Sequence, residues 1–279
     1  MAIVSISRGS YSLGSEIATR VAAELGYRCL SREVLLEASK EFNVPEVDLS
    51  HAIEAPPSLL DRLTNGRARY VAFIRSTLLR HFCADEIVYH GLAGHFFVQG
   101  VQHVAKVRVV ADMDYRVGVV VEREGIDADE ARAQLQRSDE ARRQWTTSLY
   151  GVDPEDTSLY HLFIHVGKVG LDGAVTMICD FARQERFRTT TESQAALDDL
   201  AIAAEVEARL ADMESAPSQF EVTANQGEVQ VLLHSGPRIL GGSDRSFRTH
   251  YVDTLQHDLY QRVRKLRGLK HLTVHFAED

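Results

Sequence analysis

Two glycines near the N-terminus have the spacing of a phosphate-binding loop. Gly9 and Gly14 bracket the segment GSYSLG, between an apolar strand expected at 2–7 and a helix expected at 15–25. A loop in this position presents backbone N–H groups and the positive end of the helix dipole to an anion. The residues that we expect to bind a phosphate-bearing cofactor are Arg8, Gly9, Ser10, Ser12, Gly14, Ser15 and Glu16.

The loop departs from the GxxxxGK[ST] pattern at its last two positions. Ser15 stands where a lysine normally bridges the terminal phosphates, and Glu16 stands where a hydroxyl normally holds magnesium. The two glycines alone are also compatible with an ordinary strand-to-helix turn.

Cationic side chains that could stabilise a transferring phosphate follow in a charged helical region expected at 127–145. Arg142 lies three residues after Asp139, so both side chains share one helical face. We assign Arg142 to gripping a phosphate, Asp139 to orienting that phosphate or a base, and Arg143 to supplying further charge. The alternative is an exposed, salt-bridged helix.

Strands and helices alternate over the first two thirds of the chain. This order predicts a parallel sheet with helices on both faces. Besides the first strand and helix, we expect strands at 86–89, 106–111 and 162–166, and helices at 32–41, 68–82, 115–124, 127–145 and 172–186.

The order of elements changes after the polar stretch RTTTESQ at 188–194. We expect a helix at 197–213, strands at 220–224 and 229–234 joined by a tight turn at 225–227, a helix at 248–266 and a strand at 271–276. The chain is therefore expected to form an α/β domain at 1–188 and a small α+β module, αββαβ, at 195–279.

The first domain resembles the cytidylate kinase-like family of P-loop nucleoside-monophosphate kinases over about residues 1–186. The segments that carry the resemblance are ISRGSYSLGSEIA (6–18), LGY (25–27), SREVL (31–35), ADMDYR (111–116), EREGI (122–126), DEAR (139–142) and YHLFIH (160–165). The family often has Arg at the position of Ser15 and Asp at that of Ser31. It has Gly-Arg where this chain has Gly91-Leu92, and Asp at the position of His161.

The resemblance implies a P-loop kinase fold that binds ATP with Mg²⁺ and transfers the γ-phosphate to a small acceptor such as a nucleoside monophosphate. The missing polar groups leave a second interpretation open. In it the protein is a non-catalytic nucleotide or phosphate sensor that signals through its C-terminal module. A structural interaction protein without a nucleotide is the third alternative.

The C-terminal module resembles a BON domain, a small ligand- or surface-binding module, over about residues 197–276. The resemblance rests on the helix at 199–210, on GEVQVLLHSG (227–236) and on GLKHLTV (268–274). A generic interaction or dimerisation module is the alternative. We therefore expect this module to bind a protein, a ligand or a second copy of the chain.

Composition limits the remaining classes of function. The 279 residues carry a net charge of −9, which disfavours specific nucleic-acid binding. The three widely spaced cysteines and the absence of a signal-like N-terminus or of an apolar stretch of about 20 residues favour a cytoplasmic protein without a transmembrane segment. The spacing of His90, His95 and His103 does not suggest a metal site.

Overall fold

The computed structural model describes residues 2–54, 66–91, 93–234 and 245–277. Its first half is built on a five-stranded parallel sheet in the order β2-β3-β1-β4-β5. The strands are β1 (Ile3–Arg8), β2 (Arg28–Leu30), β3 (Ile87–His90), β4 (Val104–Val110) and β5 (Leu162–His165). The predicted α/β class with a parallel sheet is confirmed. Leu92, which stands at the arginine position of the family's Gly-Arg pair, lies outside the described residues.

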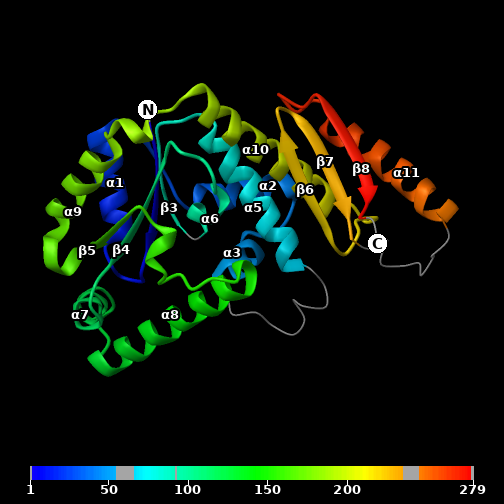
Figure 1. Cartoon of the computed structure of the whole chain (residues 1–279). Coiled ribbons are helices and arrows are strands. Elements are labelled where there is room, and N and C mark those ends of the chain that lie inside the picture. Colours follow the sequence, from blue (N-terminus) through cyan, green and yellow to red (C-terminus); the bar gives the residue numbers. More distant parts are fainter. Residues whose placement is uncertain (1, 55–65, 92, 235–244, 278–279) are drawn as a thin grey trace.

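Helices cover both faces of this sheet, as the buried apolar strands require. On one face, α1 (Gly14–Leu25) and α9 (Val166–Ala182) pack on alternate residues of β1 and β4, among them Val4, Val107 and Val109. Helices α2 (Glu33–Phe42), α3 (Glu46–Glu54) and α5 (Gly66–Phe82) belong to the core on the other face, together with Ile3 and Val104. Figure 1 shows α1 and α9 on one side of the sheet and α5 on the other.

Three further helices surround the carboxyl ends of the strands. They are α6 (Gly94–Phe97), α7 (Met113–Glu124) and α8 (Ala128–Tyr150). The long α8 runs along the lower edge of the molecule in Figure 1. In open α/β sheets, ligands bind in the crevice outside the carboxyl ends of the strands, so these helices border the expected site.

The second half is a three-stranded sheet with two helices. Strands β6 (Phe220–Asn225) and β7 (Glu228–Leu233) are antiparallel, and β8 (His271–Phe276) pairs with β7 in parallel. Helices α10 (Thr191–Ala211) and α11 (Arg245–Val263) contact this sheet and each other. The predicted αββαβ order is confirmed.

The predicted tight turn between β6 and β7 is also present. Gln226 and Gly227 both have positive φ, 52° and 80°, as a two-residue hairpin turn requires. Asp199 of α10 accepts hydrogen bonds from both of their N–H groups, at 2.7 and 2.9 Å. The turn is therefore anchored to α10.

Helix α10 belongs to two hydrophobic cores. Leu197, Ala204 and Ala208 pack in the core of the parallel sheet with α5, whereas Val206 and Leu210 pack under the small sheet. In Figure 1, α10 runs between the two sheets. Division of the chain into units at 1–188 and 195–279 stays a prediction, because one helix serves both.

The polar stretch at 188–194 contains the start of α10. Thr190 is its N-cap, and its hydroxyl accepts from the Ser193 N–H while the Ser193 hydroxyl accepts from the Thr190 N–H. This reciprocal pair is a capping box.

Two predicted helices begin too late, and several short elements were not predicted. The helix expected at 197–213 is α10, which begins at Thr191. The helix expected at 172–186 is α9, which begins at Val166 and kinks at Gly170, where φ is 74°. In the described part of the chain, the elements missed are β2, α3, α6 and two short 3-10 helices at Thr157–Leu159 and Glu185–Phe187. Among the described residues, no helix combines the length and hydropathy needed to cross a bilayer.

Candidate anion-binding site

The loop between β1 and α1 ends in a strained turn. Tyr11 and Leu13 adopt left-handed φ angles of 56° and 55°, which cost about 1 kcal/mol or more for residues with a Cβ. Leu13 is the N-cap of α1, and its side chain makes no hydrogen bond to the first turn. The first-turn N–H groups of α1 are thus not capped by that side chain and can bind an anion.

Two residues that were predicted to bind the ligand, Ser12 and Ser10, make polar contacts that hold this loop in place. The Ser12 hydroxyl is fully buried and donates to the carbonyls of Gly9 and Val109, at 2.9 and 3.2 Å. The Ser10 hydroxyl lies 2.8 Å from that of Ser138 on α8. These side chains hold the loop against β4 and α8.

Arg8 crosses the start of α1. A Cβ on Gly14 would lie 2.4 Å from Arg8 Cδ, so glycine is required where the arginine stem passes. The Arg8 charge acts on Tyr89 and His90 at the end of β3. Arg8 therefore brings a positive charge close to the helix N-terminus, from a position outside the predicted glycine-rich segment.

A cavity of about 530 Å³ opens beside the loop, at the carboxyl ends of β1 and β4. Five arginines and three carboxylates contribute to its lining. They are Arg8, Arg108, Arg116, Arg142 and Arg143, with Asp139, Glu140 and Glu155. These residues leave a surplus of two positive charges, which suits a dianion such as a phosphate.

The carboxylates pair with arginines one to one. Arg116 contacts Asp139 at 2.8 Å, and Arg143 of α8 contacts Glu140. The guanidinium of Arg142 donates to the backbone carbonyl of Arg8 at 3.2 Å, which ties α8 to the start of the loop. Arg116 is only 9% exposed, and its Nε is buried without a partner, so its charge faces the cavity at a high desolvation cost.

A second cavity, of about 450 Å³, adjoins the first and shares two residues with it. Arg8 and Arg142 line both. Ser31, Arg32 and Tyr89 are among the other lining residues of the second cavity. Two spaces large enough for small phosphorylated ligands thus meet at one pair of arginines.

Comparison with known protein families identifies the first part of the chain. A model of the cytidylate kinase-like family matches residues 3–168. The chain belongs to the cytidylate kinase-like family. The resemblance seen in its sequence is confirmed for this region, whereas a BON-like C-terminal domain is not shown and stays a prediction.

Two curated cytidylate kinases match a short part of the chain. The protein from Methanopyrus kandleri is 33% identical and that from Thermococcus sibiricus 36% identical over 73 residues. These 73 residues are 26% of this chain and span 38% of the length of each relative.

Among solved structures, an uncharacterised protein from Eubacterium ventriosum matches 66% of this chain and all of its own, with a TM-score of 0.51 and 21% identity. This likeness concerns the fold alone.

The predicted site residues separate into two groups in this family member. Arg8, Gly9, Asp139, Arg142 and Arg143 line the first cavity. The other five predicted residues line neither of these two cavities. Ser10, Ser12 and Gly14 are buried, and Ser15 and Glu16 are exposed on the first turn of α1.

Two arginines that were not assigned to the site, Arg108 and Arg116, line the cavity. Arg116 is the early arginine of the ADMDYR segment, so the family pattern pointed to it. Arg108 lies on β4 between Val107 and Val109, where a charge in a strand that is buried on both faces was the available signal.

His95 adds a neutral polar group to the cavity wall. Burial lowers its pKa to about 3, with help from the charges of Arg108 and Lys106. Its Nε2 lies 3.4 Å from the Tyr160 hydroxyl, which donates to the carbonyl of Pro154 at 2.9 Å. Near neutral pH this imidazole is uncharged, so it can donate or accept a hydrogen bond without adding charge.

Acidic residues at the site do not form a metal centre by themselves. In the parts of the chain that the structure describes, no group of three or more His, Cys, Asp or Glu side chains could hold a metal ion. Asp112, at the end of β4, is instead paired with His165 and Lys168, at 3.0 and 3.2 Å. Magnesium usually binds through one or two carboxylates together with substrate phosphates. A magnesium ion would therefore be held chiefly by the phosphates of a bound nucleotide.

Proposed function

We propose that this protein binds a nucleoside triphosphate such as ATP, with its phosphates at the start of α1 and in the arginine-lined cavity. The observation that carries the proposal is the convergence of Arg8, Arg116, Arg142 and Arg143 on the cavity at the end of β1, beside N–H groups that the N-cap side chain leaves uncapped. Phosphate binding needs this combination of charge and directed donors.

The adjoining cavity supports a second phosphorylated ligand, and with it a phosphotransfer reaction. An oxygen of the acceptor phosphate would attack the γ-phosphorus as its bond to the bridging oxygen of the β-phosphate breaks, which yields a nucleoside diphosphate and a phosphorylated acceptor. Because Arg8 and Arg142 line both cavities, they would stabilise the charge of the group in transit. Magnesium, where it accompanies the nucleotide, would neutralise part of the phosphate charge.

The transfer is expected to be weak or absent with CMP. Loss of one charge-stabilising donor typically lowers a rate by about 10²–10³. Ser15 offers no charge in place of lysine, and Glu16 adds a negative charge to the first turn of α1. The arginines of α8 replace the missing lysine charge only in part, because they approach the phosphates from another side.

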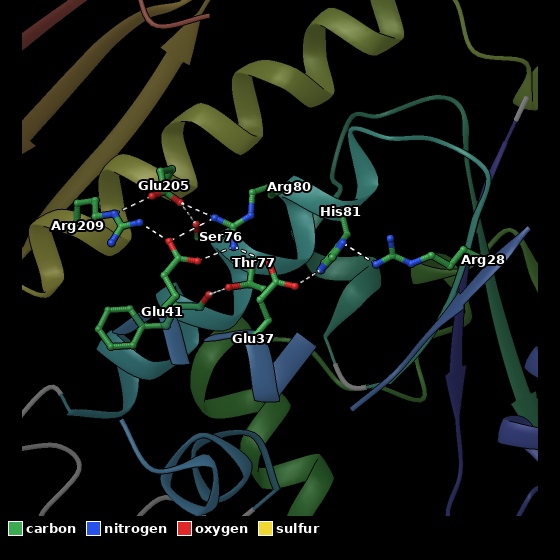
Figure 2. A network of polar contacts seen from close by, with 10 residues as sticks. Arg28, Glu37, Glu41, Ser76, Thr77, Arg80, His81, Glu205 and Arg209 are labelled. Carbon is green, nitrogen blue, oxygen red and sulfur yellow. Dashed lines mark hydrogen bonds and ion pairs between the residues drawn. The ribbon is translucent and has the colours of Figure 1, made fainter. Parts of the chain in front are cut away.

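A non-catalytic nucleotide sensor is the second candidate, and a contact far from the cavity favours it. Helix α2, whose Val34 and Leu35 line the second cavity, is joined to α10 of the C-terminal module through α5. Arg80 of α5 contacts Glu41 of α2 at 2.5 Å, and Arg209 of α10 also contacts Glu41. Figure 2 shows these side chains meeting between the three helices. Occupancy of the second cavity could thus be transmitted to the C-terminal module, for which a protein, ligand or second copy remains the proposed partner.

Titration calorimetry with ATP, ADP and inorganic phosphate, followed by a coupled assay with CMP, UMP, dCMP and AMP as acceptors, tests the proposal. We expect binding that weakens as salt rises, and turnover well below the usual kinase range of about 1–100 s⁻¹. Arg142→Met should weaken binding by about 10- to 100-fold, whereas Arg188→Met, at a surface pair outside the cavity, should not change it.

The outcomes separate the candidates. Absence of binding up to millimolar ligand would refute nucleotide binding. Turnover in the usual kinase range would refute the sensor. With low turnover, a gain of ATP affinity in Ser15→Lys would show a nucleotide pocket that lacks a charge, and no gain would favour a different ligand.

A further inference from the structure

The inner wall of the arginine cavity has a polar face that phosphate binding at the loop does not explain. Ser7 of β1 and Arg108 of β4 are partners in the sheet register. Val107 and Val109 belong to the core under α1 and α9, so Arg108 points to the opposite face, toward α6. Its side chain reaches the cavity from within the sheet and the residue is only 7% exposed.

The Arg108 guanidinium is held in place from three sides. Its Nη1 donates to the Ser7 hydroxyl at 2.9 Å, and the guanidinium lies 5.8 Å from the centre of the Tyr160 ring. Its Nη2 contacts a carboxylate oxygen of Glu155 at 3.3 Å. The Nε is buried and has no hydrogen-bond partner.

This environment is unfavourable for a charge unless an anion joins it. Removing a guanidinium from water costs several kcal/mol, which is offset only by close, well-oriented pairing. The Glu155 side chain is 71% exposed, and its contact with Arg108 is long for a charge-assisted hydrogen bond. Glu155 therefore satisfies Arg108 only in part, and a ligand anion could replace it.

Neighbouring groups complete a subsite. His95 is 3% exposed, lines the cavity and has a buried Nδ1 without a partner. Lys106 lies on the same face two residues before Arg108, and its Nζ is 3.4 Å from the Gln99 side-chain oxygen. Burial of this ammonium lowers its pKa. Lys106 is not among the cavity-lining residues and adds positive charge nearby, whereas Arg108 and the unpaired imidazole nitrogen of His95 lie at the cavity wall.

The register also gives a spacing. Ser7 lies two residues before Gly9, so the Cα atom of Arg108 lies about 7 Å behind the start of the loop along the strand direction. A ligand with two anionic groups a few atoms apart would therefore reach the loop with one group and the Arg108 guanidinium with the other.

We propose that Ser7, His95 and Arg108 form a deep subsite that binds a second anionic group of the phosphorylated ligand, a carboxylate or a separate phosphate, in place of Glu155. This proposal rests on the proposed phosphate binding at the loop. It identifies the ligand class as a phosphate ester that carries a further anion a few atoms away.

Matched probes test the subsite in the full-length protein. Glycerol 3-phosphate carries one phosphate, 3-phosphoglycerate adds a carboxylate at the far end, and glycerol 1,3-bisphosphate adds a second phosphate there. Inorganic phosphate and pyrophosphate serve as short probes. We expect calorimetry to show at least tenfold tighter binding of a probe with two separated anions than of glycerol 3-phosphate, and the two probes of that kind distinguish carboxylate from phosphate.

Three variants sharpen the experiment. Arg108→Gln should abolish the preference for two separated anions. The affinity for the preferred probe should fall about 10- to 100-fold, and the affinity for inorganic phosphate should change less than threefold. Glu155→Gln, on an exposed side chain, should strengthen that probe by about twofold to fivefold, because the internal competitor is gone. Glu185→Gln, in the exposed Arg188 pair, is the control and should change neither.

Each result decides the matter. Equal binding of glycerol 3-phosphate and both extended probes in the wild type overturns the subsite, as does an unchanged affinity in Glu155→Gln. An equal loss of inorganic phosphate and of the preferred probe in Arg108→Gln places Arg108 in the phosphate site and also overturns it. Should Arg108→Gln not fold, the wild-type preference and Glu155→Gln decide. Failure of every probe, ATP and inorganic phosphate included, refutes the proposed function itself.

Discussion

Two groups of arginines in this protein differ in how their charges are balanced. In the cavity at the end of β1, five arginines face three carboxylates. In the cluster between α2, α5 and α10, which Figure 2 shows, Arg80 and Arg209 contact three glutamates, and Arg28 of β2 joins them through His81. The members of this interhelical cluster are Arg28, Arg80, Arg209, Glu37, Glu41 and Glu205, with His81 between Arg28 and Glu37.

The ion pairs of the interhelical cluster also share partners. Arg80 contacts Glu37 at 3.1 Å and Glu41 at 2.5 Å, and Arg209 contacts Glu205 at 2.7 Å as well as Glu41. Burial opposes the charge on Glu41, but hydrogen bonds and attraction from Arg80 and Arg209 outweigh it, so the pKa of this carboxyl lies below its usual value.

The difference between the two groups teaches how to separate structural from ligand-binding charge. A cluster that is neutral by its own composition stabilises the contact between helices, whereas a surplus of one sign beside a cavity favours a ligand of the opposite sign. Substitutions should therefore separate the two: cavity arginines should affect binding most, and cluster arginines should affect stability most.

The largest expected effect is on binding. Arg116→Met removes a buried guanidinium from the cavity and should weaken the binding of ATP and of inorganic phosphate by about 10- to 100-fold. Its effect on the midpoint of thermal unfolding should be smaller than that of a cluster arginine, because Asp139 is left partly exposed to water. Calorimetry and thermal denaturation of the same preparations measure both quantities. Equal affinity in wild type and Arg116→Met would place the anion elsewhere.

The next effect is on stability. Arg80→Met leaves Glu37 and Glu41 without their shared partner and should lower the free energy of unfolding by about 1–3 kcal/mol, since the pairs are partly exposed. Denaturant unfolding gives this value. ATP affinity should change less than threefold. A strong loss of affinity in a fully folded variant would instead support transmission between α2 and the cavity.

The smallest effect is on the pH dependence of stability. Because the pKa of Glu41 is lower in the folded protein than its ordinary value of 4.5, its contribution is fully present above about pH 4.5 and is lost as pH falls through the folded pKa. Glu41→Gln should thus flatten the decline of the unfolding midpoint below pH 4.5. Parallel curves for wild type and variant, measured by thermal denaturation from pH 6 to pH 3, would show that Glu41 does not contribute in this way.

Local patterns predicted much of the fold and part of the site. The helical periodicity of 15–25 and the alternation of strands with helices gave the α/β class, and the i, i+3 spacing placed Asp139 and Arg142 together at the cavity. The short β2 and the four-residue α6 were missed because segments of that length show too few periods. The capping box at Thr190 was read as a polar break, although its Thr-x-x-Ser spacing marks a helix start.

Contacts between elements far apart in the sequence decided which residues meet at the cavity. The sequence by itself determined where helices and strands form, the position of the glycine-rich loop and the family of the first domain, since these depend on neighbouring residues. Only the tertiary structure decided that β4 lies beside β1, which brings Arg108 opposite Ser7, and that α7 and α8 bring Arg116 and Arg142 to one cavity. A polar contact between residues about 100 positions apart leaves no pattern in the local sequence, because it depends on which strands and helices become neighbours when the chain folds.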